Sequence, residues 1–112
     1  MSDYPVLSIT QRDQVLRYLG CAATRPGIRA LNELIWSYVH KVPWESVFRI
    51  AKRRRTPVVE ERPRWPEEFW LNAIHQGGGG TCFESNYAFL ALLRSVGYEG
   101  YLTLNNMGGS IG

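Results

Sequence analysis

The chain has 112 residues, of which 45% are hydrophobic and 21% are charged, and its formal net charge is +3 at pH 7. This length suffices for one domain with a hydrophobic core, and the composition is typical of a soluble globular protein. No segment approaches the ~20 consecutive apolar residues of a membrane span, and the N-terminus lacks the pattern of a secretory signal. Two distant cysteines, Cys21 and Cys82, favour a reduced, cytoplasmic setting over a disulfide, and their spacing is not that of a metal site.

The first half of the chain is predicted to form two helices and a further helical turn. Ser8 has the spacing of a helix N-cap, and apolar residues follow it at helical period as far as Gly20. A turn over residues 24–27 leads to a stronger amphipathic helix, which Pro43 ends. The apolar face of this second helix consists of Ile28, Leu31, Leu34, Ile35, Tyr38 and Val39. Apolar residues from 44 to 50 predict another short helical turn.

Residues 51–66 are charged and rich in proline, which predicts a long irregular connection with a short extended piece near Val58 and Val59. A basic cluster overlaps the start of this segment and consists of Arg49, Lys52, Arg53, Arg54 and Arg55. Such a run is typical of a solvated surface, and the acidic residues that follow it argue against a nucleic-acid partner. A non-catalytic helical module that binds an acidic partner through this cluster remains an alternative function.

Two more helices and one strand are predicted in the second half. Pro66, which precedes two acidic residues, is typical of a helix start, and the glycines at 77–80 end that helix. The next helix is predicted over residues 82–96. The alternating residues from Tyr98 predict a strand, which needs a partner strand to be stable.

Cys82 is the strongest functional candidate, because the glycine run delivers it to the first turn of the last predicted helix. The free N–H groups and the positive end of the dipole in that turn favour a thiolate over a thiol. The dipole contributes only about 0.3–1 kcal/mol at an exposed site, so a strong nucleophile needs a second contributor such as an imidazolium. His75 is a weak candidate for that role, because it belongs to a different helix. A structural thiol is the alternative interpretation of Cys82.

Three stretches carry a family resemblance, namely residues 42–47 (VPWESV), 79–86 (GGTCFESN) and 92–98 (LLRSVGY). In this order and spacing they resemble the patterns "H-x-x-x-I-P-F-E-N-L", "R-G-G-x-C-x-E-x-N" and "L-R-x-L-G-F" of the arylamine N-acetyltransferases. With Tyr18-Leu19 of the first helix, the resemblance extends over nearly the whole chain.

The resemblance implies a mainly α chain within a larger α+β fold. A helical bundle domain over residues 1–97 would carry the cysteine, and residues 98–112 would supply the first strand of a β-barrel domain that the chain does not complete. Cys82 would accept an acetyl group from acetyl-CoA, a co-substrate rather than a bound cofactor, and pass it to an arylamine or hydrazine. The histidine and aspartate of the transglutaminase-like Cys-His-Asp triad would lie downstream, so we expect the chain alone to be inactive.

The resemblance also suggests roles for residues beside the cysteine. Trp44 and Phe83 are candidates for lining an acyl or arylamine pocket. Glu45 and Glu84 are expected to hold backbone or arginine partners inside the bundle rather than to transfer protons.

Three further residues belong to the motif around the cysteine. Gly79 and Gly80 lead the chain to it, and Asn86, on the same helix face, is expected to steady the loop through its amide. Gly78 stands where the family pattern has an arginine, so a relative with a different acyl donor or acceptor is an alternative. Amide hydrolysis on the same cysteine is another. We also expect self-association by strand pairing over residues 98–106.

Overall fold

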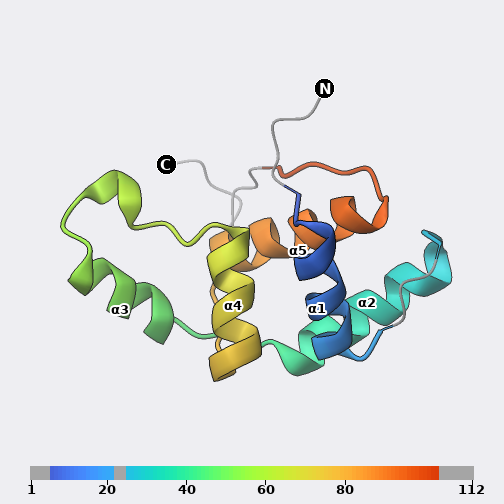
Figure 1. The fold of residues 1–112 in the computed structure, drawn as a ribbon, viewed down its shortest axis with the longest axis horizontal. Coiled ribbons are helices and arrows are strands. Elements are labelled where there is room, and N and C mark those ends of the chain that lie inside the picture. The colour runs from blue at the N-terminus through green and yellow to red at the C-terminus, as the bar shows by residue number, and fades with distance from the viewer. Residues whose placement is uncertain (1–5, 22–24, 104–112) are drawn as a thin grey trace, which may run out of the picture.

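The computed structural model describes residues 6–21 and 25–103, which form helices connected by irregular segments in a body measuring 40 × 36 × 30 Å (Figure 1). The helices are α1 (Ile9–Leu19), α2 (Ile28–Lys41), α3 (Val47–Arg55), the short 3-10 helix η1 (Val59–Glu61), α4 (Pro66–Gln76) and α5 (Cys82–Val96). The described residues contain no strand. The prediction of a mainly α chain is therefore confirmed.

Helix α1 begins and ends as its sequence predicts. The Ser8 hydroxyl oxygen accepts the backbone N–H of Gln11 at 3.1 Å, and Gly20 ends the helix in the left-handed conformation with φ of 76°. The side chain of Gln11 does not return to the cap. Its amide nitrogen donates to the carbonyl of Glu67 at 3.0 Å, which ties α1 to the first turn of α4.

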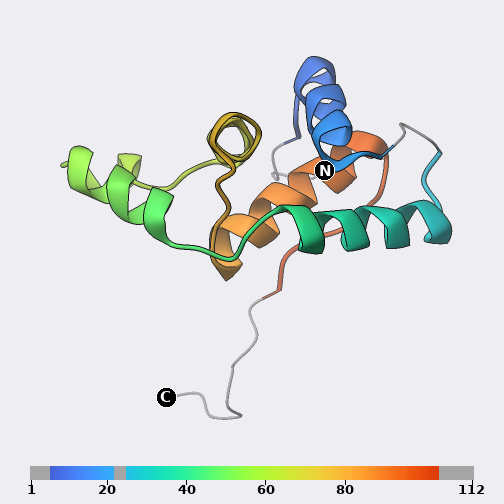
Figure 2. The same ribbon diagram turned by 90° about the horizontal axis from the view of Figure 1, so that it is seen from below.

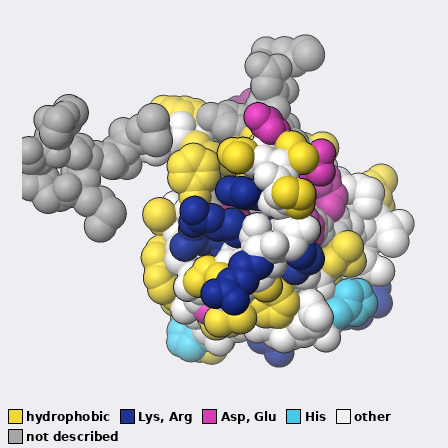
Figure 3. All heavy atoms as spheres, turned by 90° about the vertical axis from the view of Figure 1, so that its left-hand side faces the viewer, with side chains coloured by type: hydrophobic (Ala, Val, Ile, Leu, Met, Phe, Trp, Pro, Cys, Tyr) yellow, Lys and Arg dark blue, Asp and Glu magenta, His cyan; other side chains and the backbone are white. Residues whose placement is uncertain are grey.

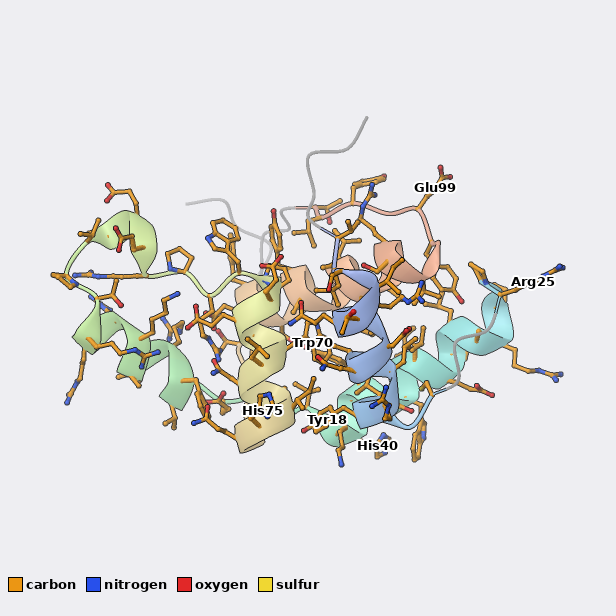
Figure 4. The ribbon with its side chains drawn as sticks, in the orientation of Figure 1. Tyr18, Arg25, His40, Trp70, His75 and Glu99 are labelled. Carbon is orange, nitrogen blue, oxygen red and sulfur yellow. The ribbon has the colours of Figure 1, made fainter. Side chains whose placement is uncertain are left out.

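The hydrophobic core lies where α5 crosses α4 and α1. Phe69 and Trp70 of α4, Ala88 and Leu92 of α5 and Val15 of α1 are fully buried. The indole N–H of Trp70 donates to the carbonyl of Ala88 at 3.0 Å, so this large ring is buried with its polar group satisfied. Figure 4 shows Trp70 between α4 and α1.

Helices α2 and α3 extend to opposite ends of the molecule (Figure 2). Only Leu34 of α2 is buried, and Ile28, Ile35 and Val39 of its predicted apolar face are exposed. No residue of α3 is buried. Much of the apolar surface predicted to pack in a bundle is thus open to solvent within the described part of the chain.

The structure corrects the prediction for residues 51–66. Helix α3 continues through the basic cluster to Arg55, and Val59 begins a 3-10 helix rather than an extended piece. Lys52 explains part of the difference, because its ammonium group forms an ion pair with Glu68 and donates to the carbonyl of Pro63 at 2.9 Å. These contacts fix the last turns of α3 against the segment that leads into α4.

The strand predicted from Tyr98 is also absent from the described residues, since the backbone of residues 98–103 is irregular. The Tyr98 hydroxyl donates to the carbonyl of Gly27, and Arg94 donates to the carbonyl of Gly100. Without a neighbouring strand, these side-chain contacts take the place of ladder hydrogen bonds. Residues 104–112 of the predicted barrel domain lie outside the described residues, and self-association through residues 98–106 stays a prediction. None of the described helices combines the length and apolar character needed to cross a bilayer.

Candidate thiol site at the start of helix α5

Cys82 is the first residue of α5, and its side chain is exposed. Thr81 precedes it in an extended conformation, and the carbonyl of Thr81 accepts the N–H of Ser85 at 2.9 Å, which closes the first turn. The N–H groups of the first turn have no partner within the helix. Among the described residues no hydrogen bond involves the Cys82 thiol. The sulfur thus lies at the positive end of α5 and is accessible to a reagent.

The glycine loop, residues 77–81, passes too close to its neighbours for side chains at Gly79 and Gly80. A Cβ at Gly79 would lie 1.8 Å from the carbonyl oxygen of Pro43, and a Cβ at Gly80 would lie 2.8 Å from the Phe69 ring. Gly77 alone in this run needs the left-handed region, with φ of 68°, where it ends α4. Glycine is therefore required at position 79 for the backbone to approach the Pro43 carbonyl, and at position 80 for it to approach the Phe69 ring.

Glu45 joins the stretch 42–47 to the glycine loop. One carboxylate oxygen accepts the N–H of Gly79 at 2.7 Å, and the other accepts the N–H of Phe48 at 3.2 Å. The carbonyl of Pro43 accepts the N–H of Gly80 at 3.3 Å. Two of the three stretches that carry the sequence resemblance, residues 42–47 and 79–86, are thus hydrogen-bonded to each other. The prediction that Glu45 holds backbone partners is confirmed.

Arg64 holds the glycine loop from its other side, and its side chain is 0% exposed. Its guanidinium donates from Nη2 to the carbonyl of Gly79 at 2.6 Å and from Nη1 to Asn72 Oδ1 at 2.9 Å. Nη2 and Nε also form a bidentate pair with Glu84, at 2.7 and 3.0 Å. The predicted arginine partner of Glu84 therefore exists. No local sequence pattern distinguishes Arg64, because it lies in a charged stretch that is typical of a solvated surface.

A groove with a volume of about 370 Å³ lies beside the start of α5. Trp44, Gly80, Ser85 and Asn86 form its polar and aromatic rim. Its apolar wall consists of Ile35, Tyr38, Val39, Val42, Pro43 and Phe89. Trp44 is 70% exposed, so its ring is available to a bound molecule. Phe83 is also exposed, at 72%, but it does not line this groove.

The role predicted for the Asn86 amide is wrong. Asn86 is exposed at the groove, and among the described residues its side chain forms no hydrogen bond to the glycine loop. The reason is that Glu45, Arg64 and the carbonyl of Pro43 already bind the loop backbone. The amide of Asn86 is left facing the groove.

Tyr38 supplies a half-buried hydroxyl in the groove wall. It donates to the carbonyl of Ser85 at 3.2 Å and shares a hydrogen bond with the Ser85 hydroxyl. Burial raises the pKa of Tyr38 to about 12, and the hydrogen bond to Ser85 opposes this shift. The hydroxyl is thus a neutral group around pH 7. Sequence analysis placed Tyr38 on an apolar face and missed its polar role.

Neither histidine is hydrogen-bonded to the cysteine. The His40 ring stacks on Trp36 with centroids 3.9 Å apart, and its Nδ1 lies 2.7 Å from the Trp36 carbonyl. His75 is exposed in the last turn of α4. Figure 4 shows the two histidines near the ends of their helices. Within the described residues neither imidazole forms a hydrogen bond with the Cys82 thiol.

Comparisons with known proteins add no assignment. No family model, no curated protein and no solved structure matches this chain. The candidate site therefore depends on its geometry and on the sequence patterns.

Proposed function

We propose that this chain is the cysteine-bearing helical part of a thiol acyltransferase similar to the arylamine N-acetyltransferases. The observation that supports this most is the position of Cys82, exposed at the first residue of α5. Cys82 itself does not line the groove, but Gly80 before it and Ser85 and Asn86 after it do. A thiol presented in this way is accessible to a substrate at the N-terminal end of a helix.

The proposed reaction has two steps. The Cys82 thiol loses its proton to solvent, and its sulfur attacks the carbonyl carbon of acetyl-CoA. A new carbon–sulfur bond forms and the bond to the coenzyme A sulfur breaks, so that coenzyme A leaves as a thiolate. The nitrogen of an arylamine or hydrazine then attacks the Cys82 thioester. The carbon–nitrogen bond forms as the bond to Cys82 breaks, and the nitrogen loses a proton to solvent.

The groove is suited to the aromatic acceptor. Its wall is mainly apolar, and the exposed Trp44 ring offers a face for stacking. Asn86 brings an unengaged amide to the same rim, which can bind the amine nitrogen. Phe83 lies outside the groove, so we assign it to contacts with the acyl donor next to Cys82.

The test is acylation of the purified chain. The chain would be incubated with acetyl-CoA, and separately with a small activated acetyl ester, and then analysed by intact mass and peptide mapping. We expect the ester to add one acetyl group to Cys82 in the Cys21→Ala variant, and none in Cys82→Ala. Without a second activating group, transfer from acetyl-CoA should be much slower than from the ester.

Addition of aniline to the acylated chain then separates the alternatives. Acetanilide formation supports acyl transfer. Release of free acetate at a rate unaffected by aniline would point to the amide-hydrolysis alternative. If Cys82 is not acylated by either reagent while it is accessible to alkylation, the proposed function is wrong.

The basic cluster supports a second candidate function, binding of an acidic partner. On the face seen in Figure 3, Lys and Arg side chains gather around α3. Arg49, Arg53 and Arg54 are exposed and have no ion-pair partner among the described residues, whereas Lys52 and Arg55 pair with Glu68. Three unpaired arginines on one short helix favour binding of phosphate groups.

Salt dependence tests this second function. A mixed-sequence single-stranded oligonucleotide would be titrated at several salt concentrations against the parent and against the triple variant Arg49→Gln, Arg53→Gln, Arg54→Gln. If the three arginines contact phosphates, the slope of log K against log salt should flatten by about 2 in the variant. A matched control with the same loss of charge is Arg17→Gln, Arg25→Gln, Arg29→Gln. Equal slopes for the two triple variants, or no binding by the parent at low salt, would exclude this function.

A further inference from the structure

Arg64 has a buried guanidinium that binds Gly79, which precedes Cys82 in the chain, and Glu84, which follows it. We propose that Arg64 is the positioning residue for the Cys82 thiol. This inference rests on the proposed function, because it concerns how that thiol is presented. Arg64 forms no hydrogen bond with Cys82, so it acts through Gly79 and Glu84.

Arg64 binds the chain on both sides of Cys82. Gly79 precedes Cys82 in the approach to α5, and Glu84 follows it in the first turn. One Nη2 atom of Arg64 donates to both, at 2.6 Å to the Gly79 carbonyl and 2.7 Å to Glu84 Oε1. The guanidinium is planar and rigid, so it sets the distance between these two attachment points. The backbone that carries the thiol is therefore held on either side of Cys82.

Arg64 also balances the charge of Glu84. Glu84 is an acidic side chain in the same helical turn as Cys82, and an unpaired carboxylate there would oppose a neighbouring thiolate. Arg64 pairs with both carboxylate oxygens, and its backbone N–H also points to Glu84 Oε2 at 3.3 Å. The negative charge is thus balanced inside the protein. The free N–H groups of the turn can then act on the sulfur without that opposition.

Arg64 is also held by residues outside the thiol site. Gly78 packs against Phe48, and a Cβ at Gly78 would lie 2.8 Å from that ring. The guanidinium of Arg64 lies between two aromatic rings, 5.8 Å from the Phe48 centroid and 5.3 Å from the Phe69 centroid. Asn72 completes its hydrogen bonds. Arg64 is thus fixed in one orientation by contacts other than those it makes to the site.

The test uses alkylation of Cys82, which needs no transferase activity. In a Cys21→Ala background we define the alkylation ratio as the iodoacetamide rate at pH 7 divided by that at pH 9.5. A free thiol is only a few per cent thiolate at pH 7, so its alkylation ratio is low. If the start of α5 presents Cys82 as proposed, the parent ratio should exceed that of free cysteine. Arg64→Lys keeps the positive charge but loses the planar set of N–H donors that binds Gly79 and Glu84 together. We expect the alkylation ratio to fall about two- to fivefold in this variant.

A second variant covers the case in which Arg64→Lys does not fold. The double change Arg64→Gln with Glu84→Gln removes both charges together, so no buried charge is left unpaired and the chain should fold. It also loses the contact to the Gly79 carbonyl, so its ratio should fall in the same direction. Circular dichroism and urea unfolding would establish the fold of each variant before alkylation.

The outcomes separate positioning from simple stabilisation. A folded variant that is less stable but keeps the parent alkylation ratio would overturn the proposal. Failure of both variants to fold would also overturn it, because Arg64 would then be a structural residue. A parent ratio no higher than that of free cysteine would refute the proposed function and this inference together. A raised parent ratio without acyl transfer would refute the function alone, and the effect of Arg64→Lys would still decide the role of Arg64.

Discussion

The carboxylate of Glu45 accepts the backbone N–H of Gly79 at 2.7 Å, across 34 positions of the chain. Arg64 binds the carbonyl of the same glycine, so both polar groups of one peptide segment are held by buried or half-buried charged side chains. Gly79 is thus the point at which residues 42–47 and 79–86, two of the stretches that carry the family resemblance, meet. The path of the chain into Cys82 depends on it.

Removal of the Glu45 carboxylate should loosen the glycine loop. In Glu45→Ala the N–H groups of Gly79 and Phe48 lose their acceptor, which should cost about 1–3 kcal/mol of unfolding free energy. Hydrogen exchange at Gly79 should accelerate in the same variant. Glu99→Ala is the control, because Glu99 points away from the protein in Figure 4 and its removal should change stability by less than about 0.5 kcal/mol. Equal effects of the two substitutions would contradict this role of Glu45.

Gly79 should tolerate no side chain at all. A Cβ there would lie 1.8 Å from the carbonyl oxygen of Pro43, a backbone atom that cannot move aside by changing rotamer. We expect Gly79→Ala to reduce stability by about 3 kcal/mol or more, as overpacking does at a rigid position. Gly27→Ala is a matched control, because Gly27 is extended and nothing lies within 4 Å of its added Cβ. Urea unfolding of the two variants measures the difference, and a Gly79→Ala protein as stable as Gly27→Ala would show that the loop can shift.

Sequence patterns predicted the helices well where local signals were strong. The Ser8 cap, Pro66 at the start of α4 and the boundaries of α5 all follow from residues within the same element. The predictions failed where contacts distant in sequence decide the structure. The pairing of Lys52 with Glu68 accompanies the extension of α3, and the segment from Tyr98 has no partner strand within the part of the chain that the structure describes.

The same distinction applies to the candidate site. Cys82 could be placed at a helix start from the glycines before it and the periodicity after it. Arg64 could not be found in this way, because the sequence around it is charged and rich in proline, like a solvated segment. Its burial follows from the approach of the glycine loop to α4, which only the tertiary structure shows. Asn86 was misassigned for the same reason, since the partners it was expected to bind were already taken.

The two tryptophans that differ most in burial should respond differently to truncation. Trp70 is 0% exposed and bonded to Ala88, so Trp70→Ala should cost about 3–5 kcal/mol, a large part of the stability of a small domain. Trp44 lies at the groove, so Trp44→Ala should change stability by less than about 1 kcal/mol while it weakens binding of an aromatic amine. Urea unfolding and a titration with aniline measure the two effects. A loss of stability in Trp44→Ala comparable to that of Trp70→Ala would mean that Trp44 is part of the core.

Tyr38 should make the protein sensitive to alkali. Its folded-state pKa is raised to about 12 from the ordinary value of 10.0, so the unfolded chain loses this proton more readily than the folded one. The stability linked to Tyr38 is therefore fully present below pH 10 and is lost as the pH rises from 10 towards 12, by roughly 2–3 kcal/mol in all.

The comparison with Tyr38→Phe isolates this residue from other groups that titrate in the same range. At pH 8 the variant should be less stable by about 0.5–1.5 kcal/mol, because the hydrogen bonds to Ser85 are gone. Between pH 10 and 12 its stability should fall less steeply than that of the parent, so the two urea-unfolding curves converge. Parallel loss of stability in both proteins would show that the Tyr38 hydroxyl ionises as readily in the folded chain as in the unfolded one, and that the groove wall admits water.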